Sequence, residues 1–293
     1  MIVLHHEELS LLPVPNPNRP ESVKNLGSAI RVRFEQASNR SDLDEAIMLH
    51  REALSLQPAP NPNRPISLDY LGLAIQRLFE LAGNCSDLDE ALKLHCEALN
   101  LQPALNSGRP MSLTNFALAV QKRFEQTGNR SDLDEAIMLY SEALSLLPTS
   151  NPYRVVPLFK LAYAFRKRFE QVGNHSDQAE AIKLHHEVLS LFPARNPYRP
   201  MSLSYLADAI QGWFEQTGDS SHLDETLALY NEALSLLPAL NLNRGGPLNS
   251  LALAIQKRFE EAGNRSDPEE VIKLYREALF TPSSGSQPSD ATR

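Results

Sequence analysis

The feature that most constrains this sequence is a period of 45 residues, which runs along nearly the whole chain without an insertion or a deletion. One column of the repeat holds an arginine in every unit: Arg19, Arg64, Arg109, Arg154, Arg199 and Arg244. A Phe-Glu pair recurs at the same period, from Phe34 to Phe259. Such a period predicts an array of small units that stack on their neighbours, in place of one compact domain.

Each unit holds the pattern of two helices. In the unit from Pro65 to Arg109, apolar residues at helical spacing predict a first helix over 66–82 and a second over 87–101. Gly83-Asn84 is expected to end the first helix, and Ser86 to cap the start of the second. Pro103 should stop the second helix. No stretch alternates as a strand would, so the sequence predicts an all-α fold.

The repeat divides the chain into six helix pairs and one lone helix. We expect units near 20–64, 65–109, 110–154, 155–199, 200–244 and 245–280. Residues 2–12 match a second helix that lacks its first-helix partner, and residues 281–293 have the composition of a disordered tail. The lone helix would leave an apolar face uncovered, through which the chain could self-associate.

The second helix carries the spacing of a known repeat family. Ala91 and Ala98 are followed by Pro103, and Leu71-Gly72 stands in the first helix. This set resembles the tetratricopeptide (TPR) repeat, although TPR units are usually about 34 residues long. The long unit is similar to fungal arrays that often accompany caspase-like CHAT domains, and we see no CHAT domain in this sequence. The resemblance implies a right-handed α-solenoid that serves as a protein-binding scaffold.

Composition argues against several classes of partner. The formal net charge is -8 and the isoelectric point is near 5.5, whereas nucleic-acid binding requires a basic surface. No apolar run approaches the roughly 20 residues that cross a bilayer, and the N-terminus lacks the pattern of a signal peptide. We therefore expect a cytoplasmic protein that binds neither nucleic acid nor membrane.

The sequence predicts no enzyme, no cofactor and no metal site. His5, His50, His95 and His185 share their column with tyrosines, which favours packing within the second helix over metal binding. Carboxylates such as Asp42 lie where helix starts favour negative charge, so capping is their expected role. The arginine column is expected to anchor each linker to a carboxylate or a carbonyl, with Glu35, Glu80 and Glu125 among the candidate partners.

The candidate binding residues follow from the TPR resemblance, which implies that the first helices line a concave groove. Their columns contain many glutamines and cations, and we expect an extended, acidic polypeptide to bind there. The alternative is that the cations only solvate the long first helix and balance the charge of neighbouring carboxylates such as Glu170. The expected groove residues are Arg31, Asp69, Leu73, Gln76, Arg77, Gln121, Lys122, Phe159, Tyr163, Arg166, Lys167, Asp208, Gln211, Gln256 and Lys257.

Other functions fit the sequence less well than a scaffold. The leading alternative is a sensor or regulatory repeat region of a larger signalling or protease-type protein. An enzyme would require a cluster of nucleophile and base that does not repeat, and we find none. A solenoid that binds RNA is disfavoured by the acidic composition.

Overall fold

The structure, a computed structural model, describes residues 2–13, 16–218, 220–238, 241–261 and 268–280. Every regular element within those ranges is a helix, which confirms the all-α prediction. The expected tail at 281–293 lies outside the described residues. The helices are α1 (Ile2–Ser10), α2 (Arg19–Ala37), α3 (Arg40–Ser55), α4 (Arg64–Ala82), α5 (Cys85–Asn100), α6 (Arg109–Thr127), α7 (Arg130–Ser145), α8 (Val155–Val172), α9 (His175–Leu191), α10 (Arg199–Thr217), α11 (Ser220–Ser235), α12 (Gly245–Glu261) and α13 (Pro268–Phe280), with 3-10 turns η1 (Pro152–Arg154) and η2 (Leu242–Arg244).

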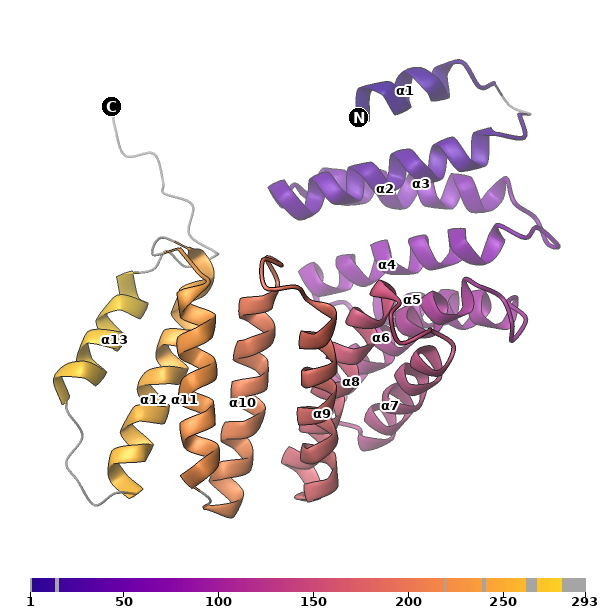
Figure 1. The fold of residues 1–293 in the computed structure, drawn as a ribbon. Coiled ribbons are helices and arrows are strands. Elements are labelled where there is room, and N and C mark those ends of the chain that lie inside the picture. The colour runs from indigo at the N-terminus through magenta and orange to yellow at the C-terminus, as the bar shows by residue number, and fades with distance from the viewer. Residues whose placement is uncertain (1, 14–15, 219, 239–240, 262–267, 281–293) are drawn as a thin grey trace, which may run out of the picture. The chain divides into compact units, whose positions relative to one another are not determined.

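The chain forms two compact units, Met1–Lys160 and Leu161–Arg293, and the division falls within α8. In the first unit, α2 packs on α3, α3 on α4, α4 on α5, α5 on α6 and α6 on α7 (Figure 1). In the second unit, α9 packs on α10, and α10 to α13 continue the same pattern. The even-numbered helices from α2 to α12 are the predicted first helices, and the odd-numbered helices from α3 to α13 are the second helices.

The core lies between consecutive helices and is repeated along each unit. Leu71 and Ile75 of α4 pack against Ala91 of α5, and Ile47 and Leu54 of the preceding helix complete that cluster. A helix pair alone would leave one side of this apolar layer in water. Stacking buries the layer, because α4 and α6 in the first unit, and α10 and α12 in the second, contact the second helices on both of their sides.

Two devices set the ends of the helices. Gly83 ends α4 in the left-handed region, with φ of 69°, and its amide donates to the carbonyl of Phe79 at 2.7 Å. Asn84 is the N-cap of α5, because its Oδ1 accepts from the backbone nitrogen of Ser86 at 3.3 Å. The prediction that Ser86 is the cap was therefore wrong by two residues. Ser86 only adds its hydroxyl to the same oxygen of Asn84, at 3.1 Å.

The lone N-terminal helix α1 lies on α2, where Ile2 and Leu9 extend the cluster of Leu26 and Ile30 (Figure 1). None of its residues is buried, and Val3 remains 68% exposed. Self-association through this helix stays a prediction. None of the described helices combines the length and the apolar character needed to cross a bilayer.

The repeated arginine joins three helices. Arg109, at the start of α6, donates to Glu142 of α7 at 2.9 and 3.2 Å and to the carbonyl of Gln102, just after α5, at 3.2 Å. The same carbonyl and carboxylate contacts recur at Arg19, Arg64, Arg199 and Arg244. The expected anchor role is confirmed. The suggested partners Glu35, Glu80 and Glu125 were wrong, because the carboxylate comes from the second helix.

We expect Arg109→Ala to lower the free energy of unfolding by roughly 1–2 kcal/mol, because charge-assisted hydrogen bonds to two neighbouring helices are lost. The shift of the urea midpoint measures this effect. Arg130→Ala is the control, since Arg130 is 58% exposed and lies 3.7 Å from Asp134 of its own helix. Equal shifts for the two variants would contradict the role assigned to Arg109.

Candidate functional site

The expected groove residues lie on the even-numbered helices, and we call the surface that these helices present in each unit the groove face. Their exposure differs widely. Asp69, Gln76 and Gln121 are buried, at 2%, 7% and 2% exposed. Arg31, Leu73, Lys122, Phe159, Tyr163, Arg166, Lys167, Gln211 and Lys257 are half-buried, whereas Arg77, Asp208 and Gln256 are exposed. A partner could reach the last two groups without a change in the fold.

The cations of the first unit form a ladder with glutamates of the first helices. Arg77 of α4 pairs with Glu80 of the same helix and lies 3.9 Å from Glu35 of α2. Lys122 of α6 pairs with Glu125 at 2.8 Å and lies 3.7 Å from Glu80 of α4. Each of these cations therefore links its own helix to the preceding first helix.

The second unit contains part of the same arrangement. Arg166 and Lys167 of α8 both pair with Glu170 at 2.7 Å. Lys257 of α12 pairs with Glu215 of α10, the preceding first helix. These pairs agree with the alternative interpretation of the cation columns, in which carboxylates on the same face balance the positive charges.

The buried groove candidates serve as internal partners of the second helices. Asp69 accepts a hydrogen bond from Ser112, and its other oxygen lies 2.8 Å from Nδ1 of His95. The hydroxyl of Tyr140 donates to Oε1 of Gln121 at 3.1 Å. Burial raises the pKa of Tyr140 well above its ordinary value, so the phenol remains protonated and can donate.

Three histidines of the column, His50, His95 and His185, pack inside the helix pairs, as the sequence predicted, whereas His5 lies on the lone helix α1 and its side chain is 24% exposed. His50 and His95 are 0% exposed, and His185 is 5% exposed. The ring of His95 lies directly on Gly72, where an added Cβ would stand 2.7 Å from the ring. Burial lowers the pKa of both His50 and His185 to about 4, so both rings are neutral at pH 7. The part of the chain that the structure describes contains no group of three or more side chains that could hold a metal.

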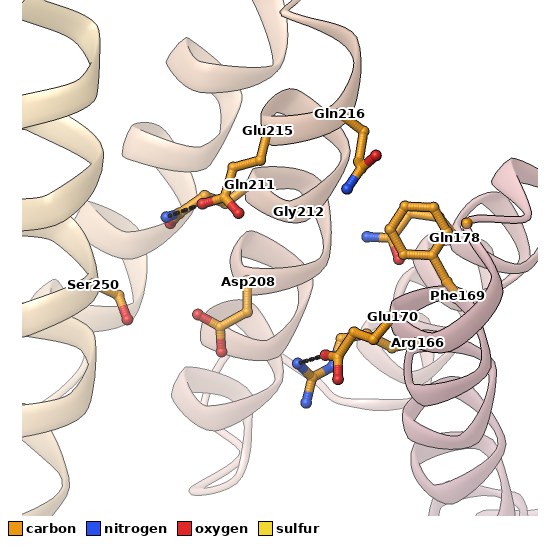
Figure 2. A pocket seen from close by; sticks show the side chains of 11 residues that line it. Arg166, Phe169, Glu170, Gln178, Asp208, Gln211, Gly212, Glu215, Gln216 and Ser250 are labelled. Carbon is orange, nitrogen blue, oxygen red and sulfur yellow. Dashed lines mark hydrogen bonds and ion pairs between the residues drawn. The ribbon is translucent and has the colours of Figure 1, made fainter. Parts of the chain in front are cut away.

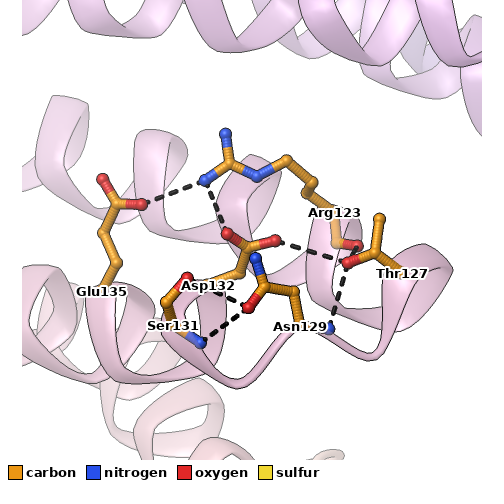
Figure 3. A network of polar contacts seen from close by, with 6 residues as sticks. All are labelled: Arg123, Thr127, Asn129, Ser131, Asp132 and Glu135. Atoms are coloured by element: carbon orange, nitrogen blue, oxygen red, sulfur yellow. Dashed lines mark hydrogen bonds and ion pairs between the residues drawn. The ribbon is translucent and has the colours of Figure 1, made fainter.

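Sequence reasoning missed an ion pair that joins the two helices of three helix pairs, at Arg33–Asp42, Arg123–Asp132 and Arg168–Asp177. Arg123 of α6 donates to Asp132 of α7 at 2.9 Å and to Glu135 at 3.1 Å (Figure 3). Arg33 and Asp42 make the equivalent pair with two hydrogen bonds, at 2.8 and 2.9 Å. Asp42 was expected to cap its helix. Its carboxylate accepts hydrogen bonds from the arginine instead. The arginine and the aspartate recur nine residues apart, and this spacing could have identified the pair.

The second unit also contains a cavity of ≈ 460 Å³ on its groove face (Figure 2). Its walls come from α8, α9, α10 and α12, and include Arg166, Glu170, Asp208 and Glu215. Asp208 accepts a hydrogen bond from the hydroxyl of Tyr230 at 2.5 Å. Partial loss of water around Asp208 raises the pKa of its carboxyl above the ordinary value.

Two solved structures have a similar fold. TPR-like repeats of a kinesin light chain-like protein from Podosopora anserina give a TM-score of 0.52 at 20% identity, over 74% of this chain and 97% of that one. BtubC from P. vanneervenii gives 0.53 at 17% identity, over 86% and 96%. No protein-family model and no curated protein matches the sequence. These likenesses concern the fold alone, which is that of a TPR-like helical solenoid.

We expect the buried histidines to make stability depend on pH. The pKa of His50 is about 4 in the folded protein, against an ordinary value of 6.5 for histidine, so the unfolded chain binds more protons between these values. Stability is therefore full above pH 6.5 and falls as the pH drops toward 4, by roughly 1–2 kcal/mol at pH 5. Comparing the urea midpoint at pH 7 and pH 5 for wild type and His50→Gln isolates this contribution.

The His50→Gln variant should lose less stability than wild type over that interval, because glutamine does not titrate. The control is His6→Gln, which alters a histidine whose side chain is 52% exposed. If wild type and His50→Gln lost equal amounts of unfolding free energy between pH 7 and pH 5, His50 would not titrate with a lowered pKa.

Proposed function

We propose that this chain is a scaffold that binds a polypeptide segment along the groove face of its first helices. The observation that carries the proposal is the row of side chains that the even-numbered helices present there. Phe159 and Tyr163 on α8 and Leu73 on α4 are half-buried apolar side chains among polar neighbours. A face with partly exposed apolar groups between polar groups fits a segment that needs both apolar contact and hydrogen bonds.

The polar clusters that the structure describes support binding over catalysis. The ion pairs on the groove face, the linker arginines and the capping asparagines each recur from repeat to repeat. A catalytic site brings different groups together at one place, where a nucleophile or an acid needs its own base or orienting partner. Groups that recur in every unit instead maintain the stacking of the helices.

The ion pairs weaken the case for an acidic segment. Lys122 and Lys167 each lie within 2.8 Å of a glutamate on their own helix. A carboxylate from a partner would have to compete with these internal carboxylates and would be repelled by them. Preference for an acidic ligand is therefore not part of the proposed function. The reading as a sensor region of a larger protein also stays a prediction that these contacts do not test.

The test is affinity capture from a lysate of the source organism with two charge-matched variants. The groove variant carries Arg77→Glu, Lys122→Glu and Lys167→Glu. The control variant carries Lys93→Glu, Lys183→Glu and Lys273→Glu, three exposed lysines in one column of the second helices. We expect proteins captured by wild type to be lost from the groove variant, by about tenfold or more, and kept by the control. Quantitative mass spectrometry measures the loss.

Circular dichroism and thermal melting should first show that both variants keep the helical fold. If the groove variant retains all partners while the control loses them, the binding surface is on the second helices and the proposal is wrong. Should the groove variant unfold, Tyr163→Ala with Leu73→Ala provides a milder change on the same face, and the same comparison then applies.

A further inference from the structure

The last described helix, α13, keeps the apolar face of an internal second helix on its outer side. Ile272 and Leu279 stand in columns that hold only leucine or isoleucine in every unit. In α11 the same two positions are Leu227 and Leu234, which are 6% and 8% exposed. Ile272 is 46% exposed and Leu279 is 81% exposed, because no helix among the described residues follows α13 (Figure 1). We call this uncovered apolar pair the end face, and it is unlike the polar outer face that terminal helices of such arrays need for solubility.

The internal junctions show what covers such a pair. In the second unit, Leu227 and Leu234 of α11 share one apolar cluster with three residues of α12, the following first helix. Those three are Leu248, Leu251 and Ile255, at positions i, i+3 and i+7 on one side of the helix. The first unit contains an equivalent cluster between α3 and α4. The end face therefore fits a helix that carries a stripe of this kind.

The row of glutamates on the groove face ends at the same place. Glu215 of α10 pairs with Lys257 of α12, the following first helix, and a similar contact joins α4 to α6. Glu260 of α12 holds the next position in this column and accepts a hydrogen bond from Gln256 at 2.9 Å. No following first helix among the described residues brings a cation to Glu260. A docked helix would gain an ion pair there if a lysine or arginine followed its last apolar position by two residues, as Lys257 follows Ile255.

The lone helix at the other end of the chain differs from α13. Glu8 of α1 stands in a column that holds alanine or valine in the other units. Ala53 of α3 is 0% exposed, whereas the side chain of Glu8 is 52% exposed and accepts a hydrogen bond from Ser22 at 2.7 Å. A helix that covered α1 as α2 covers α3 would place apolar atoms against this carboxylate, which is unfavourable. An apolar stripe therefore suits α13 better than α1.

Neither residues 281–293 nor a folded second copy can supply the stripe. Residues 281–293 contain no leucine, isoleucine, valine, methionine or aromatic residue. In a second copy, the leading residue of the stripe is at most 1% exposed in all six first helices, at Val23, Leu68, Leu113, Leu158, Leu203 and Leu248. Uncovering one of these residues would break a junction of that copy. We therefore expect the stripe to come from a different polypeptide.

We propose that the end face of α13 is a docking site for an amphipathic helix of another protein. That helix has the pattern of this chain's own first helices, with large apolar residues at i, i+3 and i+7 and a lysine or arginine at i+9. Its apolar stripe covers Ile272 and Leu279, and its cation reaches Glu260. The docked helix takes the position of a further first helix and extends the array by one layer. The inference goes beyond the proposed function, because it needs no ligand on the groove face.

The probe is an end-capped, fluorescein-labelled peptide with the sequence of residues 245–261, which is that of α12. Fluorescence anisotropy follows its binding to the full chain, and we expect saturable binding of one peptide per chain. A matched peptide with Leu251→Gln and Ile255→Gln keeps the length and the charge and should bind about tenfold more weakly. Equal binding of the two peptides, or no binding of the first, would overturn the proposal.

Two variants of the chain locate the site. Ile272→Gln with Leu279→Gln should lower the affinity for the peptide about tenfold. The matched control, Met48→Gln with Met138→Gln, changes two apolar side chains of other second helices that are 65% and 68% exposed, and should keep the affinity. Circular dichroism shows whether both variants keep the helical fold. Unchanged binding by the α13 variant, or an equal loss in the control, would place the peptide elsewhere and contradict the assignment.

A charge exchange tests the contact with Glu260. The peptide with Lys257→Glu should bind wild type about two- to fivefold more weakly, which is the size of an exposed ion pair. Glu260→Lys in the chain should restore the affinity of this peptide and weaken that of the unchanged one. Equal affinities in all four combinations would contradict the proposed placement of the cation.

The remaining outcomes separate this site from the groove face and from a second copy. The groove variant, with Arg77→Glu, Lys122→Glu and Lys167→Glu, should bind the peptide as wild type does. Loss of binding in that variant, with binding kept in the α13 variant, would place the peptide on the groove face. Sedimentation of wild type without peptide is the last measurement, and we expect a monomer. A dimer that Ile272→Gln with Leu279→Gln converts to monomer would mean that a second copy covers the end face, and the assignment to another protein would then be wrong.

Discussion

The arginine that opens the first helices sets the geometry of the array. In five repeats its guanidinium reaches back seven residues to a carbonyl beyond the preceding second helix and forward 33 residues to a glutamate. One side chain thus fixes three consecutive helices. The apolar layers supply most of the stabilising free energy, but they are non-directional. Arginine contributes direction, because its donors match a carboxylate and a carbonyl only in a narrow range of helix placements.

The period and the apolar spacing were enough to predict the helix pairs, and the bounds of α4 and α5 differ from expectation by two residues or fewer. The polar partners were harder to predict. Glu52 and Glu35 recur with the same period, so spacing alone could not show which of them Arg19 binds. The two lie on different helices of one pair. In the structure, Arg19 binds Glu52, which lies on the second helix of the pair.

The groove columns show why variability in a repeat is hard to interpret. Asp69 lies in a column that varies from unit to unit, which is also what a ligand-reading surface would show, whereas the column of Gln121 holds only glutamine and arginine. In the structure both side chains have partners within the helix pair, because Asp69 faces His95 and Gln121 faces Tyr140. Each pair matches a first-helix acceptor to the aromatic residue of its own second helix.

The fixed reach of the linker arginine also bears on how such a chain can change in length. Removing residues 65–109 would place Glu142 33 positions after Arg64, where Glu97 stands now. The new junction would present the same donors and acceptors at the same separations as the old one. Loss or gain of a whole unit is therefore a mild event for this architecture, whereas a shift by one residue within a linker would break contacts to three helices at once. Unequal recombination between units of equal length could lengthen or shorten the groove face while each surviving junction keeps its contacts.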